Sequence, residues 1–322
     1  MTSVTPVPYD PELLPAIDAV IERVRQDGRM TPANLHRARG DGYQKTLAEW
    51  VGARPVEFED RSIPGPAGAP DLTVSILRPA DRPISGGLYH VHGGGMVVGT
   101  RFEAIDRVLS WVVDFGLVAA LPDYRLAPEH PHPAPVEDCY AGLCWMSEHA
   151  REWGFDPARL VIMGGSAGGG LSAAVSLLAR DRGGPGLAGQ ILLCPMIDDR
   201  DETVSSRQYD DDGPWNRTSN HTGWDSLLGT ARGGPDVSPY AAPARATDLS
   251  GLPPAYIEVG AAELFRDEDV AYASKIWAAG GQAELHVWAG GCHGFEMVVP
   301  DAAVSRAALA ARTSWLRRVL DL

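Results

Sequence analysis

The stretch that most constrains this chain is a glycine-rich turn after a short apolar run. Residues 160–163 read Leu-Val-Ile-Met, and residues 164–170 read Gly-Gly-Ser-Ala-Gly-Gly-Gly. A single serine, Ser166, therefore lies between glycines where a predicted strand gives way to a helix. Glycines leave room for the strand and helix to cross and permit a strained backbone that lifts the serine hydroxyl above the sheet. The pattern Gly-X-Ser-X-Gly is typical of a nucleophile elbow, in which Ser166 is reachable by a base and a substrate.

The same glycines also suit an anion-binding turn at a helix N-terminus. The Lys-Ser or Lys-Thr pair of a phosphate-binding loop does not follow them, and the glycine spacing of a dinucleotide site is absent. The choice between the two interpretations depends on partner residues elsewhere in the chain.

Strand and helix patterns alternate along most of the sequence. Helical apolar spacing separates the strand patterns, so we predict an α/β fold with a mostly parallel sheet covered by helices on both faces. Apolar runs bounded by Gly and Pro predict strands at Leu72–Leu77, Gly87–Val91, Leu117–Leu121, Leu160–Met163, Gln190–Leu193, Ala255–Val259 and Ala283–Trp288. The helices are expected at Glu103–Phe115, Ala134–Trp153, Ala167–Arg180, Asp267–Ala279 and Ala302–Leu320.

Two stretches break this alternation, the N-terminal residues 1–51 and the segment 198–234. Ligands of open α/β sheets bind beyond the carboxyl ends of the strands, and long insertions in compact domains are usually functional. We therefore expect both stretches to form a cap over that edge, with residues 52–197 and 235–322 forming one catalytic core. Surface elaboration away from the site is the alternative for the second stretch.

Composition excludes several classes of partner. The 322 residues carry a net charge of −14, which disfavours binding to nucleic acid or to an anionic membrane surface. The N-terminus lacks the basic and apolar regions of a signal peptide, and no window is apolar for long enough to span a bilayer, so we expect a cytoplasmic protein. The four irregularly spaced cysteines are interpreted as small buried residues.

A second glycine run, His92-Gly93-Gly94-Gly95, directly follows the strand Gly87–Val91. Bare backbone amides at such a position suit an oxyanion hole, which needs hydrogen-bond donors fixed in advance. We assign these donors to the N–H groups of Gly94, Gly95 and Ala167, and expect His92 to anchor the loop. Taken alone, the run would be interpreted as an ordinary turn; its position upstream of the serine elbow favours the catalytic interpretation.

These motifs together resemble those of hormone-sensitive-lipase-like carboxylesterases. The resemblance is carried by His92–Gly95, by Asp123-Tyr124-Arg125-Leu126-Ala127-Pro128-Glu129 and by Gly165–Gly169. Residues 240–254 are similar to the heroin-esterase branch. The resemblance implies an α/β-hydrolase with a helical cap that cleaves short acyl esters, and it implies that the segment after Tyr124 supports the oxyanion loop.

Triad order in this fold is nucleophile, acid, histidine. His221, His286 and His293 follow Ser166 in the chain. His293 lies in a glycine-rich loop after the last predicted strand and matches the His-Gly-Phe of the family, so it is the expected base. His286 lies inside that strand, and His221 lies in the expected cap.

The acid departs from the family pattern. Where relatives carry Asp-Pro-Leu-Arg-Asp, this chain has Glu263-Leu264-Phe265-Arg266-Asp267. Glu263 takes the place of the aspartate, and either carboxylate can orient a histidine in this fold. Glu258 and Asp267 are the rivals. Gly165 is a second departure, because the family often has an acidic residue there.

The predicted function is therefore hydrolysis of short-chain acyl esters by Ser166, Glu263 and His293 through an acyl-enzyme. A lactonase or amidase would use the same groups, and a non-catalytic small-molecule receptor on the same fold is a further alternative. We expect a small-molecule ester as partner, no cofactor and no metal, since His90–His92 and His130–His132 lack a third ligand and Asp210–Asp212 suits a solvated loop.

Two further expectations concern the pocket and the assembly. The aromatic residues Tyr209, Trp215 and Trp224 of the expected cap are candidates for the pocket wall, although such residues are at least as often simple packing. The last strand, Ala283–Trp288, is a candidate sheet edge, and pairing with a second copy would give a homodimer.

Overall fold

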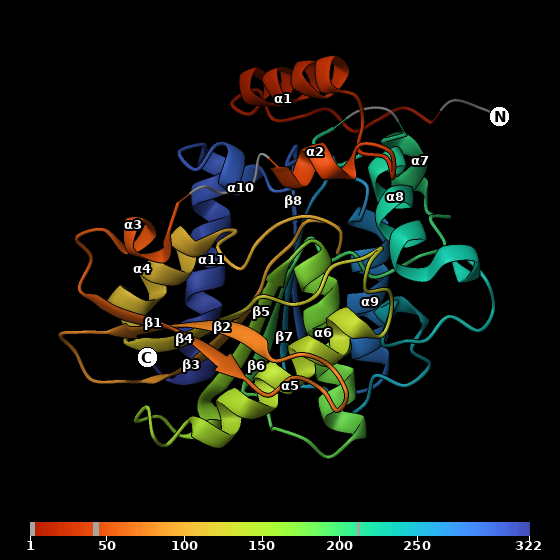
Figure 1. Cartoon of the computed structure of the whole chain (residues 1–322). Coiled ribbons are helices and arrows are strands. Elements are labelled where there is room, and N and C mark those ends of the chain that lie inside the picture. The colour runs from red at the N-terminus through yellow and green to blue at the C-terminus, as the bar shows by residue number, and fades with distance from the viewer. Residues whose placement is uncertain (1–3, 41–44, 211–212) are drawn as a thin grey trace.

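The apolar runs of the sequence form one eight-stranded sheet (Figure 1). The computed structural model describes residues 4–40, 45–210 and 213–322. The strands lie in the order β1-β2-β4-β3-β5-β6-β7-β8, with β1–β2 and β2–β4 antiparallel and the other pairs parallel. Their bounds are Val56–Ile63 (β1), Leu72–Pro79 (β2), Gly86–Val91 (β3), Leu117–Pro122 (β4), Leu160–Gly165 (β5), Gly189–Leu193 (β6), Ala255–Gly260 (β7) and Ala283–Trp288 (β8). The prediction of a mostly parallel α/β sheet is confirmed.

Helices cover both faces of the sheet because its central strands are apolar on both sides. In β5, Leu160 and Ile162 belong to one buried cluster, with helices α5 and α6, whereas Val161 and Met163 belong to another, with α4 and α11. This alternation follows from the opposite directions of successive side chains in a strand. The core helices are Ile105–Phe115 (α4), Ala134–His149 (α5), Ala167–Asp181 (α6), Arg266–Ala278 (α9) and Ala303–Leu320 (α11).

The antiparallel edge strand β1 is absent from the prediction. Its residues read Val-Glu-Phe-Glu-Asp-Arg-Ser-Ile, and only the first and last are buried. A strand at the edge of a sheet needs no apolar run, because charged side chains there prevent pairing with other chains. A search for apolar runs therefore does not identify this strand.

Helices of the N-terminal stretch, of the second insertion and of the segment after β8 gather at one end of the sheet. They are Leu14–Asp27 (α1), Leu35–Gly40 (α2), Val204–Gln208 (α7), Arg217–Leu228 (α8) and Phe295–Val298 (α10), and Figure 1 shows them at the same end of the molecule. The N-terminal segment and the second insertion bind each other, since Tyr209 Oη donates to Val7 O (3.1 Å) and Thr222 Oγ1 donates to Met30 O (2.9 Å).

One helix of the N-terminal stretch lies elsewhere. Helix α3 (Leu47–Val51) buries Leu47 and Val51 in the cluster of α4 and α11 and packs against β1. In the part of the chain that the structure describes, none of the helices combines the length and apolar character that crossing a bilayer would demand.

A buried ionic network ties the C-terminal helix to the core. The guanidinium of Arg312 on α11 is fully buried and donates to Glu258 on β7 and to Glu296 on α10 (3.3 Å for the latter). Arg107 on α4 donates to the same Glu296 carboxylate at 2.5 Å, and Tyr256 Oη donates to Glu258 at 2.6 Å. Each buried carboxylate in this network therefore has a cationic partner, which offsets much of the cost of removing its charge from water.

This network predicts a large difference between two arginines of α11. Arg312→Ala leaves Glu258 without its cation, so we expect the free energy of unfolding to fall by about 3–5 kcal/mol. Arg318 pairs with Glu284 at the surface, and Arg318→Ala should lower it by at most about 1 kcal/mol. Urea unfolding of both variants measures this difference, and equal losses would contradict the proposed importance of the buried network.

Candidate active site

Ser166 stands at the sharp turn between β5 and α6. Its backbone has φ 55° and ψ −124°, a left-handed conformation that is uncommon outside glycine. Two backbone bonds hold the turn, because Ser166 N–H donates to Leu193 O (2.8 Å) and Met196 N–H donates to Ser166 O (3.0 Å). The turn expected from the Gly-X-Ser-X-Gly pattern is thus present, with the strain that such an elbow carries.

The neighbouring glycines are required by backbone contacts. A Cβ on Gly164 would lie 2.1 Å from Gly168 O, and a Cβ on Gly168 would lie 2.1 Å from Val91 O. Both distances are far shorter than a van der Waals contact. The contacted atoms belong to the backbone, so no side-chain rotation could relieve the overlap. Strands β3 and β5 and helix α6 therefore meet closely around Ser166 because these positions lack side chains.

His293 and Glu263 form a close pair. The distance from His293 Nδ1 to Glu263 Oε2 is 2.6 Å, and the second oxygen of Glu263 accepts the N–H of Gly260 at 2.9 Å. The side chain of Glu263 is 2% exposed, and that of His293 is 13% exposed. The carboxylate is thus fixed by the backbone at the end of β7 and in turn orients the imidazole, while the ring remains accessible from the cavity.

The rival residues have other partners. Glu258 accepts from Arg312, and Asp267 accepts from Ser205 N–H (2.8 Å) and from Arg266 (2.8 Å) at the start of α9. His286 lies on β8 beside Glu284, and His221 lies on α8 with its ring nitrogen 2.7 Å from Asp201. The pairing at Glu263 and His293 is the one that the sequence predicts.

The loop after β3 is held by a buried aromatic pair. The ring of His92 stacks on Tyr124 at 4.1 Å, and its Nδ1 lies 2.8 Å from Gly93 O. Tyr124 Oη donates to His92 O at 2.9 Å, and burial lowers the pKa of His92 to about 3. A neutral His92 therefore anchors the loop from below, as the sequence analysis expects, and the Tyr124 segment supports it.

The three candidate oxyanion donors differ in their surroundings. Gly94 has φ 101° and lines the cavity that contains Ser166. Gly95, with φ 63°, packs against the cap, since a Cβ there would lie 2.5 Å from the indole of Trp215. Ala167 is the first residue of α6 and is fully buried. Of the three, Gly94 is the residue that lines the cavity.

One cavity of about 270 Å³ contains both Ser166 and His293. Segments at the ends of four strands, β3, β5, β6 and β8, and the cap contribute to it. It is lined by His90, Gly93, Gly94, Glu103, Ala104, Arg107, Gly165, Ser166, Leu193, Cys194, Pro214, Trp215, His293, Gly294, Glu296, Met297 and Val298. The hydroxyl and the imidazole thus reach the same enclosed space, although they are far apart in the sequence.

Of the three aromatic residues proposed for the pocket wall, only Trp215 lines this cavity. Its ring lies 6.2 Å from that of His293. Trp224 is fully buried and packs in the core cluster beneath the cap, and Tyr209 is 1% exposed with its hydroxyl bound to Val7 O. Both therefore stabilise the cap instead of facing a ligand.

Sequence reasoning misses the polar wall of the cavity. His90, Glu103, Arg107 and Glu296 all line it. Burial lowers the pKa of His90 to about 4 and raises the pKa of Glu103, whose buried Oε2 has no hydrogen-bond partner among the described residues. Glu103 lies in the turn just before α4, and nothing in its local pattern marks it as a cavity residue.

Cys194 also differs from the expectation that the cysteines are only small buried residues. It is partly exposed, has φ 37° and lines the cavity directly after β6. Burial and the charges of Glu263 and Glu296 hold the pKa of its thiol well above the usual value. Its position at the carboxyl end of a strand beside the nucleophile strand is the signal that could have identified it.

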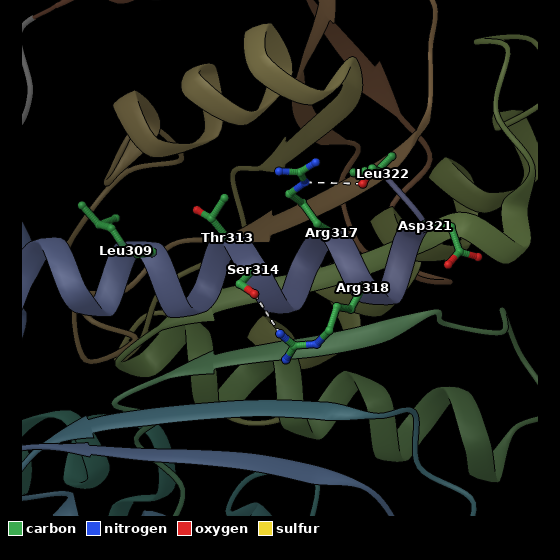
Figure 2. Close-up of a pocket in the computed structure, with 8 residues that line it drawn as sticks. Leu309, Thr313, Ser314, Arg317, Arg318, Asp321 and Leu322 are labelled. Atoms are coloured by element: carbon green, nitrogen blue, oxygen red, sulfur yellow. Dashed lines mark hydrogen bonds between the residues drawn. The ribbon is translucent and has the colours of Figure 1, made fainter.

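A separate hollow of about 760 Å³ lies on the outer face of α11. Figure 2 shows Arg317 and Arg318 there, with Arg318 donating to Ser314 (2.8 Å) and Arg317 donating to Leu322 O (3.4 Å). None of the candidate catalytic residues lines it. It is larger than the Ser166 cavity, but it brings together no nucleophile and base.

The Ser166 cavity brings together a strained serine, an imidazole held by a buried carboxylate and a loop of bare amides. Such a group of residues suits nucleophilic attack on a carbonyl carbon, with proton transfer by the histidine.

Of the acidic loop Asp210–Asp212, Asp211 and Asp212 lie outside the described residues.

Comparison with known proteins agrees with this chemistry. The profile of a family described as alpha/beta hydrolase fold matches residues 88–297. Carboxylesterase NlhH of Mycobacterium tuberculosis strain H37Rv is 36% identical over 261 residues, which cover 77% of this chain and 79% of that protein. Hormone-sensitive lipase of Bos taurus is 39% identical over 104 residues, covering 32% of this chain and 14% of that protein.

The fold is also that of a solved esterase. The structure titled Bacterial Heroin Esterase superposes with a TM-score of 0.87 at 37% sequence identity, covering 97% of this chain and 98% of the other.

Proposed function

Because this chain belongs to the α/β-hydrolase family, in the group of hormone-sensitive lipase, and is a serine-dependent carboxylic ester hydrolase, we propose that Ser166, His293 and Glu263 are its catalytic triad. The observation that carries the proposal is the 2.6 Å contact between His293 Nδ1 and the buried Glu263 carboxylate, with His293 and Ser166 lining one cavity. The strained backbone of Ser166 supports the same assignment.

Each residue has a defined task in this mechanism. Ser166 Oγ attacks the ester carbonyl carbon while His293 accepts its proton, and Glu263 keeps the imidazole in the tautomer whose free nitrogen faces the serine. The N–H groups of Gly94, Gly95 and Ala167 stabilise the negative oxygen of the tetrahedral intermediate. The proton then passes to the departing alcohol, and water activated by His293 hydrolyses the acyl-enzyme.

The substrates are proposed to be small esters with short acyl chains. The cavity volume of about 270 Å³ is just below the range of about 300–1,000 Å³ that is typical of small-molecule sites. The indole of Trp215 on one side and the buried polar groups of Glu103 and Arg107 on another limit its extension. A long acyl chain would therefore have to leave the cavity or displace the cap.

We also propose a cytoplasmic homodimer that forms through β8. Among the described residues this strand pairs with β7 alone, and Val287 on it is 42% exposed. An open edge with an exposed apolar side chain favours pairing with a second copy across a two-fold axis.

Replacing the nucleophile tests the proposed triad. Ser166→Ala removes the attacking oxygen, so we expect hydrolysis of a short acyl ester to fall by at least about 1,000-fold with the fold unchanged. Ser176→Ala changes another buried serine of α6 that bonds only to Ser172 O, and should retain the activity of the parent protein. An organophosphonate should label the parent protein and Ser176→Ala but not Ser166→Ala. Substantial turnover by Ser166→Ala would reject the nucleophile assignment.

The acid is tested separately with a matched pair of amides. Glu263→Gln keeps the size of the side chain but loses the charge that stabilises the imidazolium, so kcat should fall by about 100- to 10,000-fold. Asp267→Asn, four residues later in the same loop and helix start, should change kcat little, because Asp267 binds Ser205 and Arg266. The opposite ranking of the two variants in steady-state kinetics would transfer the role to Asp267.

Cavity size is tested with esters of graded acyl length. Acetyl and butyryl esters should be hydrolysed with higher kcat/KM than octanoyl and decanoyl esters, because the longer chains do not fit the enclosed space. Trp215→Ala should shift the preference towards longer chains, whereas Trp277→Ala, on the exposed surface of α9, should not. A parent protein that prefers long chains would contradict the proposed substrate class.

A further inference from the structure

Three side chains form a cluster at the cavity, and one of them carries a thiol that ester hydrolysis does not need. Ligand atoms of Cys194, Glu263 and His293 all lie within 4.8 Å of one another. They are one sulfur, one carboxylate oxygen and one imidazole nitrogen. Neither the proposed attack by Ser166 nor the orientation of His293 by Glu263 requires a thiol at this place.

The sheet topology explains why these three residues meet. Cys194 directly follows β6, Glu263 lies three residues after β7 and His293 lies in the loop after β8. Strands β6, β7 and β8 are adjacent and parallel, so their carboxyl ends share one edge of the sheet. The cluster therefore depends on the same framework as the candidate triad, and its residues are held by the core rather than by the cap.

The charges around the cluster favour a cation. The carboxyl groups of Glu263, Glu296 and Asp269 lie around the Cys194 sulfur. Glu296 is paired with Arg107 and Arg312, and burial holds the pKa of Asp269 well above its usual value. Glu263 is therefore the carboxylate beside the sulfur that forms no ion pair with an arginine or lysine among the described residues.

The ligand set points to the class of ion. Thiolate and imidazole together select borderline-soft ions such as Zn²⁺ over Mg²⁺ or Ca²⁺, which prefer oxygen ligands. Three protein ligands with a fourth position open to water are typical of accessible zinc sites. Cys194 and His293 both line the cavity, which gives an ion and its water a route to this position.

We propose that Cys194, Glu263 and His293 form a binding site for a zinc-class divalent cation, and that the bound ion reversibly inhibits the enzyme. Binding exchanges the thiol proton of Cys194 for the metal and involves no change in oxidation state. A coordinated His293 cannot accept the Ser166 proton, so substrate turnover and metal binding exclude each other. The inhibition rests on the proposed role of His293, whereas the binding of the ion does not.

Metal binding is tested by a readout that does not depend on activity. Co²⁺ added to Ser166→Ala should give the near-ultraviolet thiolate-to-cobalt charge-transfer band, because all three ligands remain. The band should persist when Cys144→Ser is added, which removes the other partly exposed thiol, on α5, and disappear when Cys194→Ser is added. No band in Ser166→Ala, or a band that survives Cys194→Ser, would overturn the site.

Inhibition is then measured on the active protein. Zn²⁺ should inhibit hydrolysis of a short acyl ester, and a chelator should restore it. Each variant is compared with its own metal-free rate. Cys194→Ser should raise the half-inhibitory Zn²⁺ concentration by about tenfold or more. Cys144→Ser should leave that concentration unchanged. Cys194→Ala serves as a second variant in case serine disturbs the fold.

The two assays separate the possible failures. A cobalt band without zinc inhibition would retain the site but reject its inhibitory role. Loss of the predicted Ser166 or Glu263 phenotypes would reject the triad without affecting the cobalt result. Equal zinc inhibition of the parent protein and Cys194→Ser would show that the ion acts elsewhere.

Discussion

A close backbone crossing around Ser166 is the constraint on which the rest of the site depends. Gly164 and Gly168 each approach a carbonyl oxygen to a distance at which no Cβ fits. One of these oxygens belongs to Val91, the last residue of β3, and the glycine loop starts at the next residue. The contact that makes the elbow possible therefore also fixes the start of the glycine loop, of which Gly94 lines the Ser166 cavity. A side chain at Gly168 would disturb the nucleophile and its expected oxyanion donors together.

Partners distinguish the carboxylates of this region, which are similar in sequence context but differ in role. Glu258 neutralises a buried arginine, Asp267 holds the start of α9, and Glu263 faces His293. Glu263 accepts the N–H of Gly260 through one oxygen, and its other oxygen contacts the imidazole of His293. The backbone at the end of β7 thus sets the direction of this side chain.

Prediction from the sequence succeeds where a residue pattern has a local physical cause. The seven predicted strands are present, and all but β8 consist mainly of buried residues. Glu263 and His293, which the family resemblance implies as acid and base, lie in contact at 2.6 Å. Prediction fails where the neighbours decide. Strand β1 is stabilised by pairing with β2 rather than by its own apolar residues. Trp224 and Trp215 are both tryptophans of the same insertion, but Trp224 is buried in the core and Trp215 lines the cavity.

By itself the sequence determined the α/β order, the strained serine turn and the loop residues expected to act with it, because glycine spacing and apolar runs impose these features through short-range sterics and burial. The tertiary structure alone decided which side chains share the cavity. Glu103 and Arg107 come from the segment after β3, Cys194 from the segment after β6 and Glu296 from the segment after β8, and they meet only when the parallel strands align their ends. No local pattern contains that information, since the distances between side chains from different segments are set by packing of the whole sheet.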